Sequence, residues 1–65
     1  MRLKEARLSA HLTQEEAAKA LNVSRTTVTM WETGDVNPTA DKLPAIAHLY
    51  GCTINDLFRD DRKEA

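Results

Sequence analysis

Hydrophobic residues recur every three or four positions in five stretches of the chain, which is the spacing of an amphipathic α-helix. The five stretches are residues 2–10, 13–22, 24–33, 39–50 and 53–58. The clearest apolar stripe lies in the fourth stretch and consists of Leu43, Ile46, Ala47 and Tyr50. The pattern therefore predicts an all-α protein, a compact bundle of five short helices around one core.

Polar residues between the apolar stripes predict where the second and third helices begin and end. Thr13 is an N-cap candidate, and Glu16 three residues later completes the pattern of a capping box. Ser24 is placed to cap the next helix, and Gly34 suits a helix end with positive φ. Because Asn22 tolerates a left-handed backbone, we expect two short helices joined by a tight turn.

The last two helices have similar signals. Thr39 is the N-cap candidate of the fourth helix, but Pro44 removes an intrahelical hydrogen bond, so either the first turn is irregular or the regular helix starts near Pro44. Gly51 is the expected C-cap residue. Thr53 and Asp56 repeat the capping box ahead of a helix too short to hide all of its apolar side chains.

The third stretch has two distinct faces on a helical wheel. Val28 and Trp31 share the apolar side, so Trp31 belongs to the core and is not expected to stack on bases. The opposite side is small and polar and has no acidic group. Its members are Thr26, Thr29, Met30 and Thr33, flanked by Arg25 and Thr27. Such a face suits an α-helix that enters the major groove of DNA, which is about 12 Å wide.

Length and composition are those of one small domain. The chain has 65 residues, of which 29% are charged and 42% hydrophobic. We expect one domain over residues 1–58 and a charged, frayed tail over residues 59–65. No apolar run approaches the ~20 residues of a membrane span, so no membrane partner is expected. The single cysteine fits a reducing cytoplasm.

The formal net charge of −1 is unusual for a domain that binds nucleic acid, because such domains are often basic. The excess of acidic residues lies in the second half of the chain, residues 35–65. We therefore expect only modest non-specific affinity for DNA, since that affinity grows with the number of phosphates neutralised.

The motifs at fixed spacing resemble the helix-turn-helix of the Cro and phage-repressor family, a large group of bacterial and phage regulators. The matching residues are Thr13, Gln14, Glu15, Glu16, Ala18, Leu21, Val23, Ser24, Arg25, Val28, Trp31, Glu32, Gly34, Pro38, Leu43, Ile46, Ala47, Leu49, Gly51, Ile54, Leu57 and Phe58. The resemblance implies a repressor-like domain that binds a two-fold symmetric DNA operator as a homodimer, with its third helix in the major groove.

The resemblance also suggests roles for individual residues. Arg25, Thr26 and Met30 match positions from which family members contact bases, and Thr29 is their exposed neighbour. Gln14 matches a glutamine that hydrogen-bonds a DNA phosphate, a contact that the positive end of a helix dipole favours. The further candidates for phosphate contacts are Thr27, Thr33, Asn37 and Arg7.

Two more sets of residues are expected to make contacts between protein groups, one within the chain and one between two copies of it. Arg7 and Glu32 match an ion pair of the family, in which the acid orients the arginine. The apolar residues of the last helix and the tyrosine before it are the expected dimer contacts, namely Tyr50, Ile54, Leu57 and Phe58.

At two positions the chain departs from the family pattern. His11 stands where members often have glycine, although histidine adopts positive φ more readily than most residues. Asp35 follows Gly34, where the family often has a basic residue facing DNA. Asp35 and the near-neutral charge motivate a second hypothesis, in which the chain is a protein-interaction module, an antitoxin or adaptor with little DNA binding.

The sequence gives little support for a metal site or a catalytic site. His48 and Cys52 lie one helical turn apart, but a structural zinc site normally needs four ligands, and His11 is distant in sequence. Neither serine, Ser9 or Ser24, has a histidine and an acid arranged around it, and no Gly-rich loop is present. We therefore expect neither an enzyme nor a bound cofactor, metal or small-molecule substrate.

Overall fold

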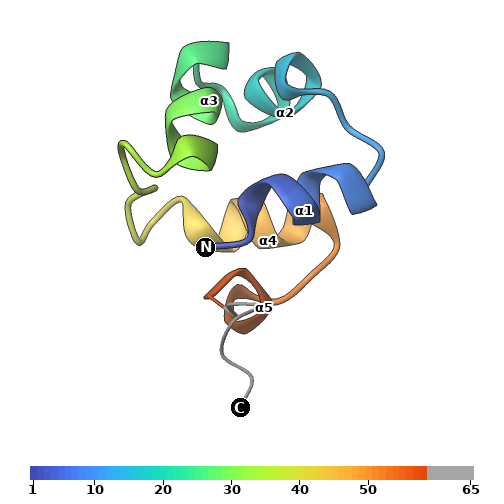
Figure 1. The fold of residues 1–65 in the computed structure, drawn as a ribbon. Helices are drawn as coiled ribbons and strands as arrows, with labels where there is room; N and C mark the ends of the chain where they lie inside the picture. The colour runs from blue at the N-terminus through green and yellow to red at the C-terminus, as the bar shows by residue number, and fades with distance from the viewer. Residues whose placement is uncertain (59–65) are drawn as a thin grey trace.

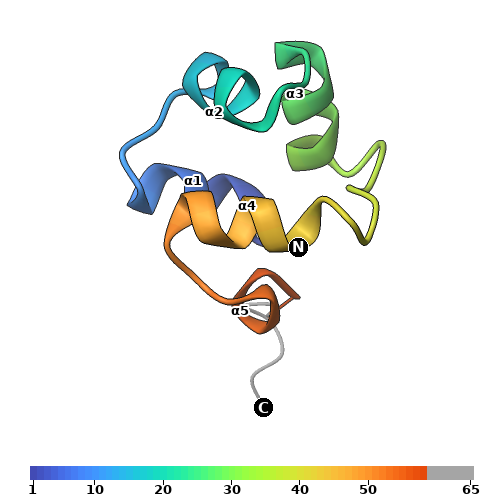
Figure 2. The ribbon, with the colours of Figure 1, turned by 180° about the vertical axis from the view of Figure 1, so that it is seen from behind.

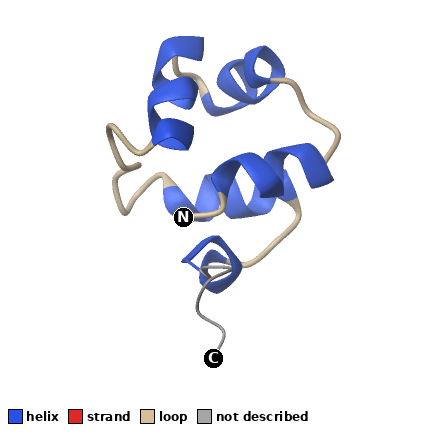
Figure 3. Cartoon of the chain, in the orientation of Figure 1, coloured by secondary structure: helices blue, strands red, loops and turns tan. Residues whose placement is uncertain are grey.

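The computed structural model of the protein describes residues 1–58, and these residues form helices without any strand (Figures 1 and 3). The helices are α1 (Leu3–Ser9), α2 (Gln14–Leu21), α3 (Arg25–Thr33), α4 (Leu43–Tyr50) and α5 (Ile54–Phe58). The predicted all-α fold with five short helices is confirmed for this part of the chain. The expected tail, residues 59–65, lies outside the described residues.

The predicted ends of α2 and α3 are confirmed. The Glu16 backbone N–H donates to the Thr13 hydroxyl over 3.0 Å, and the Thr13 N–H donates to the Glu16 carboxylate over 2.9 Å. The Thr27 N–H donates to the Ser24 hydroxyl over 3.1 Å. Asn22, with φ of 60°, forms the left-handed turn between the helices, and Gly34, with φ of 90°, ends α3.

The N-cap predicted at Thr39 is wrong. Helix α4 begins at Leu43, and its N-cap residue, Lys42, makes no side-chain cap bond. Pro44 lies in the first turn of α4, where a missing N–H leaves no intrahelical bond unmade. The second of the two alternatives, a helix that starts near the proline, is therefore the observed one, and residues 39–42 form turns before it.

The helices pack in three levels (Figures 1 and 2). α2 and α3 lie together at one end, α1 and α4 cross the middle, and α5 lies at the other end. Their apolar faces meet in one core, which consists of Leu3, Ala17, Ala18, Leu21, Val28, Trp31, Leu43, Ile46, Ala47, Tyr50 and Leu57. The Arg2 N–H donates to the Leu57 carbonyl over 2.9 Å, so the start of the chain is tied to α5.

The burial of Tyr50 and Leu57 corrects the expected dimer contacts. Their exposed fractions are 4% and 0%, because both side chains are part of the buried core. Burial also raises the pKa of the Tyr50 phenol to about 12. The other two residues of the expected set, Ile54 and Phe58, are 38% and 55% exposed and so remain available to a partner.

Among residues 1–58, no helix has both the length and the apolar character that crossing a membrane requires.

Candidate nucleic-acid interface

Helices α2 and α3 are held side by side so that the first turn of α2 faces the exposed side of α3. The turn at Asn22 is closed by the Val23 N–H, which donates to the Ala18 carbonyl over 2.9 Å. The alanines of α2 allow a close approach, because Ala17 and Ala18 are both buried against the core. This packing fixes the two parts of the candidate interface relative to each other.

The exposed side of α3 has the composition expected from the helical wheel. Val28 and Trp31 are buried, which confirms the orientation of the helix. Arg25 and Thr26 are exposed at its amino end, and Thr29 and Met30 are half-buried along the same side. The first turn of α3 contains no acidic residue. The amino end of α3 can therefore approach a polyanion without a carboxylate in the way.

A shallow hollow of about 440 Å³ lies beside the first turn of α2. Residues from three helices line it, among them Arg7 of α1, Gln14 of α2 and Arg25 of α3. The backbone N–H groups of the first turn of a helix have no intrahelical acceptors and carry a partial positive charge. Glu15, which also lines the hollow, reduces this positive potential. An anion that lies beside the amino end of α3 would therefore be close to these groups.

A buried ion pair lies between α1 and α3. The Arg7 Nε donates to Glu32 over 2.6 Å and its Nη2 donates over 3.1 Å, which is the bidentate arrangement. The Arg7 Nη1 donates to the Leu12 carbonyl over 2.7 Å. The two side chains are only 7% and 5% exposed. The pair expected from the sequence is therefore present, and Arg7 has little surface left for a phosphate.

The environment of Glu32 keeps it charged. Burial raises the pKa of its carboxyl, but the hydrogen bonds from Arg7 and Gln14 outweigh burial and hold the pKa below its ordinary value of 4.5. In turn, the hydrogen bonds to Glu32 raise the pKa of Arg7. Both groups are ionised at neutral pH, so neither is left as an uncompensated charge in the interior.

Gln14 belongs to the same hydrogen-bond network, which the sequence did not reveal. Its side-chain Nε2 donates to Glu32 over 3.0 Å, and its Oε1 accepts from the Thr29 hydroxyl over 3.3 Å. Gln14 and Thr29 are 15 residues apart, and no local pattern connects residues at that separation. Only the packing of α2 against α3 brings the two side chains together.

The two threonines proposed for phosphate contacts, Thr27 and Thr33, also make hydrogen bonds within the protein. The Thr27 and Ser24 hydroxyl oxygens lie 2.9 Å apart at the start of α3. The Thr33 hydroxyl lies 3.1 Å from the Asp35 carboxylate and 3.2 Å from the Met30 carbonyl, and it can donate to one of them. Asn37, in the loop after α3, is exposed. Thr33 is exposed as well, whereas Thr27 is half-buried.

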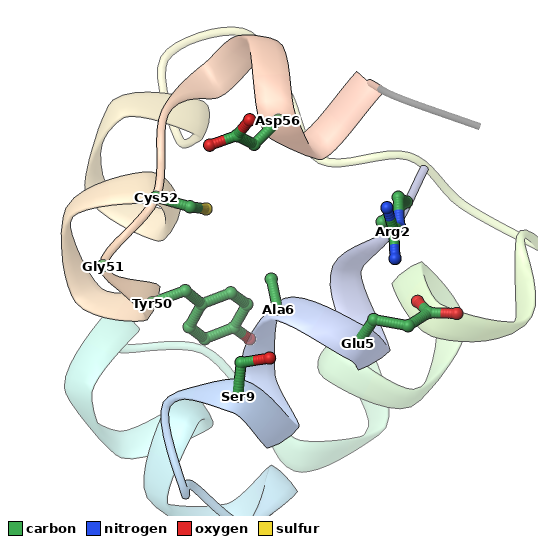
Figure 4. A pocket seen from close by; sticks show the side chains of 8 residues that line it. All are labelled: Arg2, Glu5, Ala6, Ser9, Tyr50, Gly51, Cys52 and Asp56. Atoms are coloured by element: carbon green, nitrogen blue, oxygen red, sulfur yellow. The ribbon is translucent and has the colours of Figure 1, made fainter. Parts of the chain in front are cut away.

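A second pocket of about 220 Å³ has no lining residue from α2 or α3. Figure 4 shows Arg2 and Glu5 on one side of this space, with Cys52 and Asp56 on the other. Burial, together with the neighbouring Asp56 charge, raises the pKa of the Cys52 thiol, which makes the thiol a weaker nucleophile. None of the residues proposed to contact DNA lies in this pocket.

Comparisons with known proteins agree with the geometry. The sequence profile of a family described as helix-turn-helix matches residues 3–57. An uncharacterised HTH-type transcriptional regulator of Archaeoglobus fulgidus is 38% identical over 63 residues, which are 97% of this chain and 89% of the relative.

Two longer relatives match as well. The HTH-type transcriptional activator BcrR of Enterococcus faecalis is 38% identical over 88% of this chain and 28% of its own length. The HTH-type transcriptional regulator DicA of Escherichia coli is 40% identical over 80% of this chain and 39% of its own length. The chain thus spans less than half the length of these two relatives. No solved structure gives a significant match.

Proposed function

The chain belongs to the Cro/C1-type helix-turn-helix family of DNA-binding transcriptional regulators, and we propose that it recognises a specific double-stranded operator through α3 in the major groove. The observation that carries this proposal is the acid-free, exposed amino end of α3 beside the first turn of α2. A recognition helix in the major groove presents its amino-terminal residues to the base edges.

The proposed base contacts come from the exposed side of α3. Arg25 is exposed and has the fork of donors that matches the O6 and N7 atoms of guanine. Thr26 can donate or accept a hydrogen bond, and Met30 can pack against the methyl group of thymine. Thr29 lies on the same side and is the fourth candidate for a base contact, but its hydroxyl already has a partner in the protein.

The proposed phosphate contacts surround this helix. Gln14 is the main candidate, because it stands at the positive end of α2. Asn37 is accessible in the loop that follows α3. Arg7, Thr27 and Thr33 complete the set, with weaker support because each is engaged in bonds within the protein.

We further propose that the chain acts as a homodimer on a two-fold symmetric operator. One module buries only about 600–1,000 Å² on DNA, so a single copy is expected to bind weakly. Two copies with recognition helices about 34 Å apart contact successive major grooves. Ile54 and Phe58 are exposed apolar side chains on α5 and are the proposed contacts between the copies.

Regulation by such a dimer is proposed to be repression, through occupation of a promoter. The name of BcrR describes that relative as an activator. Expression of a reporter gene placed behind the selected operator therefore tests whether this protein lowers or raises transcription. A transcriptional regulator acts where the DNA is, and we therefore expect a cytoplasmic protein.

The test of sequence-specific recognition is selection of bound duplexes from a random pool, with wild type and Arg25→Ala. We expect the wild type to select one motif and Arg25→Ala to lose its preference at one base pair of each half-site. A bidentate arginine contact contributes about 1–3 kcal/mol of discrimination, or roughly five-fold or more at that base pair. Lys4→Ala is the control, because Lys4 is exposed on α1 and does not line the hollow beside α2. Identical motifs for wild type and Arg25→Ala would remove Arg25 from the readout.

The alternative function is a protein-interaction module, an antitoxin or adaptor, on the same scaffold. The net charge of −1 and the exposed Asp35 beside α3 favour it. Salt dependence distinguishes the two functions. Micromolar or tighter DNA binding that weakens steeply with salt supports the operator-binding regulator. Absence of binding at low salt, together with a stable complex with another protein, supports the alternative.

A further inference from the structure

The Gln14 side chain is bonded at both ends of its carboxamide. Its Nε2 donates to the Glu32 carboxylate over 3.0 Å, and its Oε1 accepts from the Thr29 hydroxyl over 3.3 Å. A carboxylate only accepts hydrogen bonds, so the NH₂ group must face Glu32 and the oxygen must face Thr29. A carboxamide has two N–H donors, and the bond to Glu32 uses one of them. The second N–H is therefore held in one direction.

We infer that Thr29 and Glu32 together orient the Gln14 carboxamide so that its remaining N–H points at a DNA phosphate. Thr29 is then a positioning residue, which acts on DNA through Gln14 and does not recognise a base. This inference rests on the proposed DNA binding and adds to it a role for two side chains. Fixing the donor before binding lowers the entropy lost when the phosphate contact forms.

Glu32 is a rigid support for this arrangement. Its side chain is 5% exposed, and Arg7 holds both of its oxygens with bonds of 2.6 and 3.1 Å. Arg7 also donates to the Leu12 carbonyl, two residues before Gln14 in the chain. The network therefore links α1, the start of α2 and α3. A displacement of α3 changes the direction of the Gln14 donor as well as the position of the base contacts.

The same geometry gives Thr29 a different role from that of its neighbours on α3. The Thr29 hydroxyl has one proton, and that proton is donated inside the protein. Thr26 is exposed, whereas Thr29 is half-buried. Loss of the Thr29 hydroxyl should therefore weaken binding to all sequences alike, whereas loss of a base contact changes which sequences bind.

The test is a double-variant cycle in DNA binding, measured on the selected operator and on a scrambled duplex. Thr29→Val keeps the shape of the side chain and removes the donor. We expect about five-fold weaker binding to both duplexes, the size of one hydrogen bond, and no change in the selected motif. Thr29→Ser restores the hydroxyl and should bind like wild type. In a Gln14→Ala background, Thr29→Val should have no further effect.

Two results would overturn the inference. One is an altered base preference in Thr29→Val, which would make Thr29 a base contact. The other is a five-fold loss of DNA affinity on Thr29→Val in the Gln14→Ala background, which would show that Thr29 acts independently of Gln14. The melting temperatures of all variants control for general loss of structure.

A measurement without DNA keeps this inference separate from the proposed function. In NMR spectra of the free protein, the Gln14 side-chain NH₂ should be more ordered than that of the exposed amide Asn55. Thr29→Val should make the Gln14 amide more mobile than in wild type, because only the bond to Glu32 then remains. Equal mobility of the Gln14 amide in wild type and Thr29→Val contradicts the inference. Failure of the wild type to bind DNA contradicts only the proposed function.

Discussion

The Glu32 carboxylate shows how one buried charge stabilises this small core. Its partners are Arg7, through two hydrogen bonds, and Gln14, through one. Removal of one partner from a buried pair leaves an uncompensated charge, a change that typically costs several kcal/mol. For a domain of this size, that is a large part of the total stability. The side chain that positions the candidate interface therefore also makes the fold sensitive to acid.

The pH dependence of stability tests this conclusion. The pKa of Glu32 is lowered in the folded protein, so its contribution is present above the ordinary glutamate pKa and is lost as the pH falls through the folded value. We expect the free energy of unfolding, measured in urea, to decrease between pH 6 and pH 3. Glu32→Gln should be less stable than wild type at pH 6 and should show a smaller decrease.

Glu15→Gln is the matched control for that measurement. Glu15 is exposed on α2 and makes no ion pair with Arg7. The control should keep the wild-type dependence on pH. A decrease in Glu32→Gln as large as that of wild type would show that Glu32 is not the group responsible.

At the scale of elements, the short helices depend on tight left-handed turns. His11 and Asn22 have φ of 61° and 60°, and Gly34 and Gly51 have φ of 90° and 71°. Each of these residues ends or follows a helix, so the chain can reverse direction within one or two residues. An L-residue in this conformation costs roughly 1–2 kcal/mol, whereas glycine has no such cost. The turn between α1 and α2 is therefore strained by histidine.

We expect His11→Gly to stabilise the protein by roughly 0.5–1 kcal/mol, because removal of the strain exceeds the added freedom of the unfolded chain. His48→Gly is the matched control, since His48 is exposed within α4, where φ is negative and glycine is unfavourable. The free energy of unfolding of the control should be lower than that of wild type by roughly 0.5 kcal/mol. Thermal unfolding at pH 8 measures both changes. Destabilisation by His11→Gly would mean that the histidine makes a contact worth more than the strain.

At the scale of the whole molecule, charge sets how strongly any DNA is attracted. The net charge is −1, so long-range attraction to a polyanion is weak. Asp35 directly follows the carboxyl end of α3 and is exposed. Its negative charge stands close to the proposed path of the DNA backbone. We therefore expect affinity to come mainly from the short-range contacts of α2 and α3.

Asp35→Asn should bind every duplex about two-fold more tightly, the effect of removing one unit of repulsion at several ångströms in water. Asparagine keeps an oxygen that can accept from Thr33, so the loop should be unchanged. Glu5→Gln makes the same change in net charge at the second pocket, which no residue of α2 or α3 lines, and should have a smaller effect. Fluorescence anisotropy at low salt measures both. Equal effects of the two substitutions would mean that Asp35 has no special position relative to DNA.

The sequence by itself determined the parts of the structure that depend on neighbours within one helical turn. The capping box of Thr13 and Glu16, the turn at Asn22 and the inward face of Val28 and Trp31 were all predicted, because each follows from spacing of three or four residues. Thr39 was wrongly placed as a cap, since the proline at position 44 decides where α4 begins. The Arg7–Glu32 pair was expected only from the family resemblance.

Only the tertiary structure decided contacts between residues far apart in the chain. It buried Leu57 and left Phe58 exposed on the same short helix, a choice that depends on how α5 lies against α1 and α4. It also joined Gln14 to Thr29, which changes the interpretation of both side chains. The physical reason is that periodicity fixes which face of a helix is apolar, whereas the meeting of two polar side chains depends on the position and rotation of one packed helix relative to another.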